Sequence, residues 1–254
     1  MSRRAWLVAG TIVAAVTLAF GTFQVVSLLA RSTKEATTRF EAVRHVTIDN
    51  DAGSIRLRPS PNRTLSIDRK ETRGLTKPAY SERMEGDRLV VDADCRVGFS
   101  SWCSVELEVA VPAGVDVDAS GGGGSVRADG IDGGLRLRSS GGSITVVGGG
   151  AVLDLESSGG SVDVESGRAE QVKARSSGGS VRVRSAIVPR TLEARSSGGS
   201  VTVEVPDGPT AYRVDASSSG GSSRTQVRTD PTSDRLITAR SSGGSVTVRY
   251  LSPT

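Results

Sequence analysis

Residues 153–164 read LDLESSGGSVDV and residues 172–183 read VKARSSGGSVRV, so a Ser-Ser-Gly-Gly-Ser segment separates two runs of alternating apolar and polar residues. Apolar residues two positions apart are typical of a strand with one buried face. Glycine and serine between two such runs predict a tight turn or corner. Each segment therefore predicts two short strands joined by a corner, with the glycine pair supplying the backbone angles.

The same corner recurs through the second half of the chain. Ser-Ser-Gly-Gly-Ser begins at positions 139, 157, 176, 196, 218 and 241, and residues 121–125 form a degenerate earlier copy. A flexible Gly/Ser linker would not have runs of alternating apolar and polar residues on both sides, as these segments do. Because a two-strand unit cannot bury its apolar face alone, equivalent units must stack, with adjacent strands about 4.8 Å apart. We therefore predict an all-β fold, a single-stack β-solenoid with one two-strand rung per corner.

The outward residues test this stacking, because they alternate in charge between copies. One outward position of each copy is occupied in turn by Asp118, Arg136, Asp154, Lys173, Glu193, Asp215 and Thr238. Opposite charges on adjacent strands stabilise a sheet by about 0.2–1 kcal/mol per pair, which favours parallel rungs in register. The sixth rung is the weak one, because Ser223 replaces an inward Val or Ile and Asp215 follows Glu193 without a base between them.

A solenoid needs both ends covered. Residues 43–112 contain less regular strands and are predicted to form an N-terminal β cap, with a divergent corner at 51–55. Tyr250, Leu251 and Pro253 are predicted to close the other end. The expected division of the chain is a cytoplasmic tail at 1–4, a transmembrane helix at 5–30, a juxtamembrane linker at 31–42, the cap at 43–112 and the β-solenoid repeats at 113–254.

Residues 5–30 predict a membrane anchor, since these 26 residues carry no charge. As a helix they would span about 39 Å, more than the roughly 30 Å hydrocarbon core of a bilayer. A cleaved signal peptide is the alternative, but Leu28 would occupy position −3 of a cleavage site after Ala30, where small residues are favoured. Arg3 and Arg4 precede the span, so we expect a single-pass protein of the cell membrane with a cytoplasmic N-terminus and an extracytoplasmic β domain.

Cys95 and Cys103, eight positions apart, are the chain's two cysteines. An oxidising compartment would let them form a disulfide. The loop between them carries Phe99 and Trp102, which are candidate binding anchors; the alternative is that both rings pack over the solenoid end. Two thiols and the single histidine, His45, do not make a recognisable metal site, so we expect no metal and no cofactor.

Composition argues against nucleic-acid binding, because 32 basic residues are offset by 28 acidic ones and aromatics make up only 4%. Three carboxylates, of Asp154, Glu156 and Asp163, invite comparison with a glycosidase pair. We expect them instead to be surface charges of the rungs, paired with Arg136, Arg138, Arg175 and Arg182. The first serines of the corners are expected to hydrogen-bond along the stack. No catalytic residue is predicted, and the chain is not expected to be an enzyme.

Residues 105–146 read VELEVAVPAGVDVDASGGGGSVRADGIDGGLRLRSSGGSITV. With the N-terminal anchor and the repeated Ser-Gly-Gly corners, this segment resembles the bacterial putative-adhesin family of β-strand repeats, a family of unknown function. The resemblance covers about residues 43–250, although the corner of that family often reads Ser-Gly-Asp and here reads Ser-Gly-Gly-Ser.

The resemblance implies an envelope-associated surface protein. We therefore predict a non-enzymatic, adhesin-like or scaffold module on a membrane anchor, whose partner would be an envelope polymer or a surface protein. The main alternative is a sensor or regulatory ectodomain of an envelope-stress system that signals through a membrane partner. A carbohydrate-active β-helix enzyme is the third.

Overall fold

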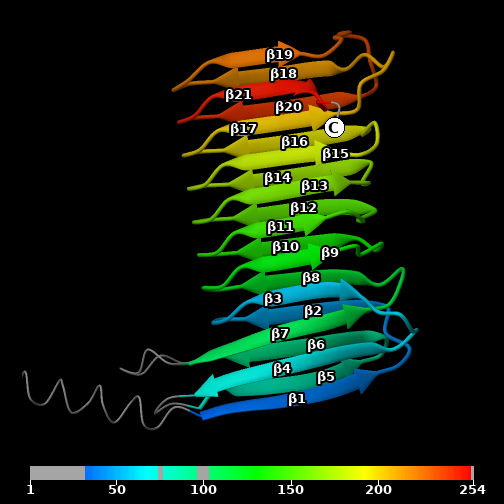
Figure 1. Ribbon diagram of the computed structural model, residues 1–254, viewed down its shortest axis with the longest axis vertical. Helices are drawn as coiled ribbons and strands as arrows, with labels where there is room; N and C mark the ends of the chain where they lie inside the picture. The colour runs from blue at the N-terminus through cyan, green and yellow to red at the C-terminus, as the bar shows by residue number, and fades with distance from the viewer. Residues whose placement is uncertain (1–31, 74–76, 96–102, 253–254) are drawn as a thin grey trace, which may run out of the picture.

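The structure is a computed structural model that describes residues 32–73, 77–95 and 103–252, and those residues form 21 β-strands in two sheets (Figure 1). Nothing helical within these ranges is long and apolar enough to cross a membrane. The transmembrane helix predicted at 5–30 lies outside the described residues.

One sheet has 11 strands, in the spatial order β1 (Ser32–Phe40), β4 (Leu65–Arg73), β7 (Ser104–Val111), β3 (Ile55–Pro59), β9 (Val126–Asp129), β11 (Ile144–Val147), β13 (Val162–Gly167), β15 (Val181–Ser185), β17 (Val201–Val205), β21 (Val246–Tyr250) and β19 (Ser223–Gln226). The other has 10, in the order β18 (Arg213–Ser218), β20 (Leu236–Ser241), β16 (Thr191–Ser196), β14 (Gln171–Ser176), β12 (Val152–Ser157), β10 (Leu135–Ser139), β8 (Asp116–Gly121), β2 (His45–Asn50), β6 (Arg88–Asp94) and β5 (Ala79–Glu85).

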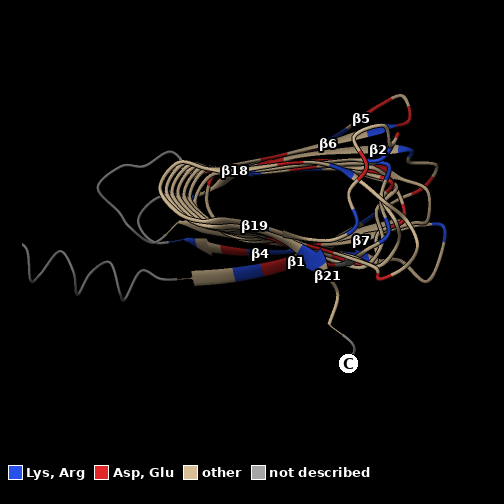
Figure 2. Ribbon diagram, turned by 90° about the horizontal axis from the view of Figure 1, so that it is seen from above, with Lys and Arg blue, Asp and Glu red and all other residues tan. Residues whose placement is uncertain are grey.

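Each rung contributes one strand to each sheet, and the rungs stack in parallel. β10 pairs with β12 so that Leu135 faces Leu153 and Leu137 faces Leu155, and the corresponding strands of later rungs keep the same register. Viewed along the stack, the corners superpose at one side of a flattened tube (Figure 2). The all-β, parallel-rung architecture predicted from the repeats is confirmed.

Small aliphatic side chains fill the space between the sheets. Inward residues such as Leu137, Leu155, Ala174 and Ala194 are completely buried, and they belong to one continuous apolar cluster that follows the stack. Tyr212 is the one aromatic residue among the largest fully buried side chains of the described chain. A core this narrow accounts for the low aromatic content of the sequence.

The corner motif is explained by hydrogen bonds and close contacts between rungs. Ser157 Oγ donates to the carbonyl of Gly142 on the preceding rung (2.9 Å) and accepts from its own corner, from Gly160 N (2.9 Å). A Cβ on Gly160 would lie 2.4 Å from the carbonyl carbon of Gly142. The stacking role predicted for these serines is confirmed. The reason given for the glycines was wrong, because Gly159 and Gly160 do not have positive φ angles; they are needed because adjacent backbones approach so closely.

At the C-terminal end the rungs do not stack in sequence order, contrary to the expectation. The last rung, β20–β21, lies between β16–β17 and β18–β19. Thr238 consequently separates Glu193 from Asp215, two carboxylates that sequence order would have placed side by side. The exchange also places Arg249 opposite Glu204. Both of these pairings favour the observed order, although the same exchange places Arg195 directly opposite Arg240.

The weak rung identified from the sequence forms the tip of the stack. Ser223 and Thr225, which take inward positions elsewhere filled by valine, are exposed on β19. The prediction that Tyr250 and Leu251 close this end was wrong, because β21 pairs with strands on both sides. A terminal rung buries only one of its edges, so polar residues cost little there. Pro253 lies outside the described residues.

The N-terminal region continues the stack. β2 and β3 pair in parallel with β8 and β9, and β6 and β7 form the next level. The divergent corner at 51–55 contains Gly53, whose φ of 126° favours glycine. Antiparallel strands β1, β4 and β5 complete this end. Residues 43–112 thus contribute two further parallel levels, and not only an irregular cover.

Candidate functional site

Most outward charges on the 10-stranded sheet neutralise one another across rungs. The guanidinium of Arg136 on β10 lies 3.5 Å from the carboxylate of Asp118 on β8 and 3.7 Å from that of Asp154 on β12. Lys173 is in register with Asp154 and with Glu193. The predicted alternation of charge along this column is confirmed from Asp118 to Glu193.

Three arginines break this rule. Arg175 on β14, Arg195 on β16 and Arg240 on β20 are direct register partners, so like charges occupy three successive strands. Like charges directly opposite one another weaken strand pairing. Nearby carboxylates offset part of the repulsion: Glu193 is 2.6 Å from Arg175 and 2.9 Å from Arg195, and Asp215 accepts a hydrogen bond from Arg240. Three guanidinium groups therefore share two ion-paired carboxylates.

The ionisation of Glu193 reflects its position between these cations. Partial burial alone would raise the pKa of its carboxyl, but the hydrogen bond and charge of Arg175, together with the charge of Arg195, hold that pKa below the usual value. Glu193 is therefore a carboxylate at neutral pH. It anchors two of the arginines without cancelling both charges.

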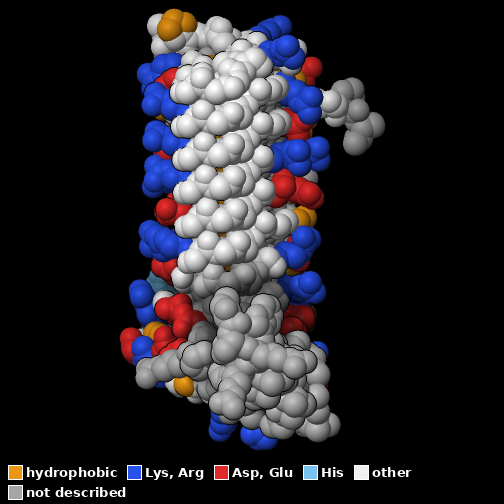
Figure 3. Space-filling view, turned by 90° about the vertical axis from the view of Figure 1, so that its left-hand side faces the viewer, with side chains coloured by type: hydrophobic (Ala, Val, Ile, Leu, Met, Phe, Trp, Pro, Cys, Tyr) orange, Lys and Arg blue, Asp and Glu red, His pale blue; other side chains and the backbone are white. Residues whose placement is uncertain are grey.

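The three arginines line a groove of about 500 Å³ beside the corners. We call it the Arg–Ser groove; its lining includes Arg175, Arg195, Arg240, Ser177, Ser197, Ser219 and Ser242, together with one carboxylate, that of Glu156, at the end next to Arg175. The arginine side chains are 38%, 46% and 51% exposed in that order, and the second serine of each corner is also exposed. Figure 3 shows the corners as a continuous ridge along the stack, flanked on both sides by basic side chains with acidic ones among them.

The arginine triplet was not predicted, because its continuity depends on the rung order. By sequence order Ser217 would separate Arg195 from Arg240, whereas the placement of β20 against β16 brings them together. A signal was nevertheless present: Ala-Arg-Ser-Ser-Gly-Gly-Ser occurs at 174–180, 194–200 and 239–245. The other complete corners lack the Ala-Arg pair before the serines.

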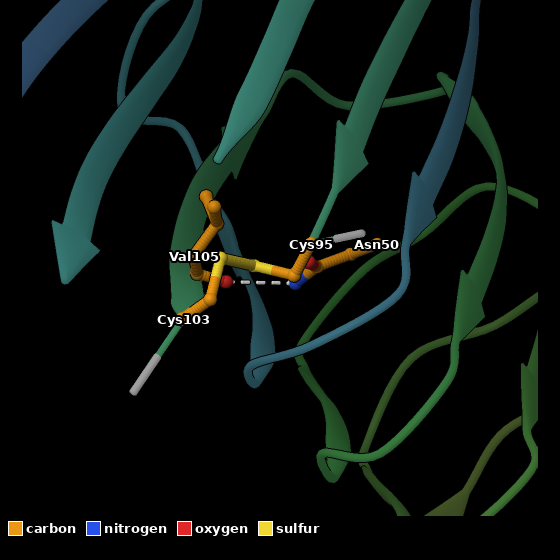
Figure 4. The surroundings of a disulfide bond; sticks show 4 residues. All are labelled: Asn50, Cys95, Cys103 and Val105. Carbon is orange, nitrogen blue, oxygen red and sulfur yellow. Dashed lines mark hydrogen bonds between the residues drawn. A yellow bond between two sulfur atoms is a disulfide. The ribbon is translucent and has the colours of Figure 1, made fainter. Parts of the chain in front are cut away.

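The predicted disulfide between Cys95 and Cys103 is present (Figure 4). It joins the end of β6 to the start of β7, at the level where other rungs have a glycine corner. Asn50 lies beside it, completely buried, and donates from Nδ2 to the carbonyl of Val105 (2.8 Å). Phe99 and Trp102 lie outside the described residues, and their binding role remains a prediction.

The carboxylates considered for catalysis do not converge. Asp154 on β12 and Asp163 on β13 belong to different sheets, and Asp163 lies 3.9 Å from Arg182. Glu156 is in register between Arg138 and Arg175, but those arginines make ion pairs with Asp118 and Glu193. Two of the expected partners of Glu156 are thus engaged elsewhere.

His45, the single histidine, does not lie in a cluster of metal-ligating side chains. His45 is half-exposed at the start of β2, with Nδ1 3.7 Å from the carboxylate of Asp116. Within the described ranges, no three His, Cys, Asp or Glu side chains come together as a metal site.

A stack of short parallel rungs with glycine corners and outward charge columns defines the chain as a β-solenoid repeat protein. The family model Toastrack DUF4097 matches residues 116–250, and the chain belongs to that family. The resemblance to a β-strand-repeat family of unknown function is confirmed. No curated protein matches the chain.

Several solved structures are similar over most of the chain. A putative cell adhesion protein from Clostridium sporogenes has 8% identity and a TM-score of 0.40, over 87% of this chain and 100% of its own. A putative adhesin from Bacteroides fragilis has 14% identity and a TM-score of 0.48, over 87% and 98%. A putative adhesin from Parabacteroides merdae has 12% identity and a TM-score of 0.33, over 87% and 96%.

Proposed function

We propose that the protein is a non-enzymatic, adhesin-like binding or scaffold module, held on the outer side of the cell membrane by the apolar segment at 5–30. The observation that carries the proposal is the Arg–Ser groove, where three arginines in direct register on successive strands share two ion-paired carboxylates. Exposed polar residues that weaken their own sheet are better explained by binding than by stability.

The positions of the candidate carboxylates favour binding over glycoside hydrolysis. The candidate carboxylates lie on opposite outer faces or beside arginines, so they do not form the facing pair that glycoside hydrolysis requires. A long stack that repeats the same outward positions suits an extended partner, because equivalent contacts recur from rung to rung.

The test compares intact cells that carry the full chain with cells that carry a variant lacking residues 104–252, which keeps the anchor. We expect cells with the full chain to be retained on envelope polymer purified from the same cells, and cells with the variant to pass through. Equal retention of both cell types would contradict adhesion. If, in addition, a transmembrane protein co-purifies with the full chain in mild detergent, a sensor or regulatory ectodomain replaces the adhesin-like module as the proposed function.

A further inference from the structure

We infer that the Arg–Ser groove binds a linear acidic polysaccharide, one whose carboxylate groups lie along the stack. The inference rests on the proposed function and names the ligand of the surface described there. It concerns the face of β14, β16 and β20, and not the disulfide loop.

The first argument is the electrostatic repulsion between the three arginines, which lie in register on adjacent strands. Arg175, Arg195 and Arg240 face one another on strands about 4.8 Å apart, where opposite charges or neutral residues would pair better. The neighbouring column shows that this chain does pair opposite charges: Asp118, Arg136 and Asp154 alternate. A local cost without a structural benefit marks a candidate functional site.

The second argument is the number of unused donors. A guanidinium carries five N–H donors in a planar fork that matches a carboxylate. The shortest contact of Arg195 is from Nε to a carboxylate oxygen of Glu193 that also accepts from Arg175, and its two terminal nitrogens donate no hydrogen bond within the described chain. Arg240 likewise engages Asp215 through one terminal nitrogen. Both side chains keep donors that face solvent.

The third argument concerns the class of ligand. Exposed hydroxyls of Ser177, Ser197 and Ser242 accompany the arginines rung by rung, and a hydroxyl can both donate to and accept from sugar hydroxyls. No aromatic side chain lines the groove, which disfavours a single-stranded nucleic acid, because such ligands stack their bases on aromatic rings. Carboxylates for the arginines and hydroxyls for the serines are both present in an acidic polysaccharide.

The experiment measures binding of the full chain, in neutral detergent, to immobilised polygalacturonate, with neutral dextran, inorganic polyphosphate and single-stranded oligo-dT as parallel probes. The groove variant is R175Q/R195Q/R240Q. The matched control, R127Q/R182Q/R224Q, removes the same charge from the 11-stranded sheet. We expect the groove variant to bind polygalacturonate about tenfold more weakly and the control less than about threefold more weakly.

Salt and folding provide the remaining controls. Binding should weaken between low and physiological ionic strength, because the contacts are exposed charges. If the groove variant does not fold, S177A/S197A/S242A replaces it, since those side chains are exposed; a smaller but measurable loss is then expected.

Equal losses in the groove and control variants, or binding to polyphosphate or oligo-dT as tight as to polygalacturonate, would overturn the inference in favour of general charge attraction. These outcomes are separable from the proposed function. Cells retained on envelope polymer without polygalacturonate binding would refute only the groove's ligand, and groove-dependent binding by a chain that is not exposed on cells would refute only the proposed function.

Discussion

At the scale of single residues, each position of the corner has its own task. The first serine joins two rungs, since Ser139, Ser157, Ser176, Ser196, Ser218 and Ser241 each donate to a glycine carbonyl of an adjacent rung. The second glycine of the pair permits close stacking. The second serine is exposed to solvent. Asn50 takes the place of the first serine at the start of the stack, in register with Gly121.

Replacing a corner glycine tests this account. Gly160→Ala should lower the free energy of unfolding by about 1–3 kcal/mol, because its Cβ would meet the backbone of Gly142 and Ser143. Gly208→Ala is the matched control, because nothing lies within 4 Å of its added Cβ, and should change stability by less than about 0.5 kcal/mol. Urea unfolding followed by circular dichroism gives both values. Equal stability of the two variants would contradict the steric role of the corner.

At the scale of strands and rungs, the sequence predicted the strands and their register but not the order in which the last rungs stack. Alternation on both sides of each corner was enough to predict paired strands, their inward faces and their parallel register. The exchange of the last two rungs was not predictable by counting repeats, because stacking order is a long-range choice among similar rungs. Two clues pointed to it: Asp215 could not follow Glu193 favourably, and Ser223 was a poor core residue. The arginine triplet of the groove follows from the same exchange.

The ion pairs of Glu204 depend on the exchanged order of the last two rungs, so they provide a test of it. This buried carboxylate on β17 accepts from Arg184 Nε (2.5 Å) and from Arg249 Nε (2.8 Å), and Arg249 reaches it only because β21 adjoins β17. Burial alone would raise the pKa of Glu204, but the hydrogen bonds from Arg184 and Arg249 outweigh it and hold that pKa below the usual value. The pairing therefore stabilises the fold above the unfolded-state pKa of about 4.3, and the contribution is lost as pH falls through the lower folded-state pKa.

We expect Glu204→Gln to lower stability at pH 7 by about 1–2 kcal/mol, since it removes the charged acceptor shared by two half-exposed arginines. The difference from the unmodified chain should begin to shrink as pH falls below the unfolded-state pKa of about 4.3. It should be lost below the lower folded-state pKa, where Glu204 is neutral in both states. Glu170→Gln, at an exposed position, serves as control and should show neither effect. Thermal unfolding between pH 3 and pH 7 measures the difference. A pH-independent difference would argue against the ion pairs.

At the scale of the whole molecule, the fold places its distinctive surfaces along one side. The corners form a continuous ridge (Figures 1 and 3). The disulfide replaces a corner near the N-terminal end, and the Arg–Ser groove lies beside the corners of later rungs. A rod with its special features on one side suits lateral contact with an extended partner. The sequence predicted the rod and the disulfide, whereas the groove required the stacking order.

Protease treatment of intact cells, combined with labelling of free thiols, tests the central claim that this rod works outside the membrane. The account predicts that external protease removes the β domain from the cells, and that Cys95 and Cys103 resist labelling until a reductant is added. A β domain that survives in intact cells but is digested after lysis, with thiols that react at once, would contradict the account and place the rod on the inner side of the membrane.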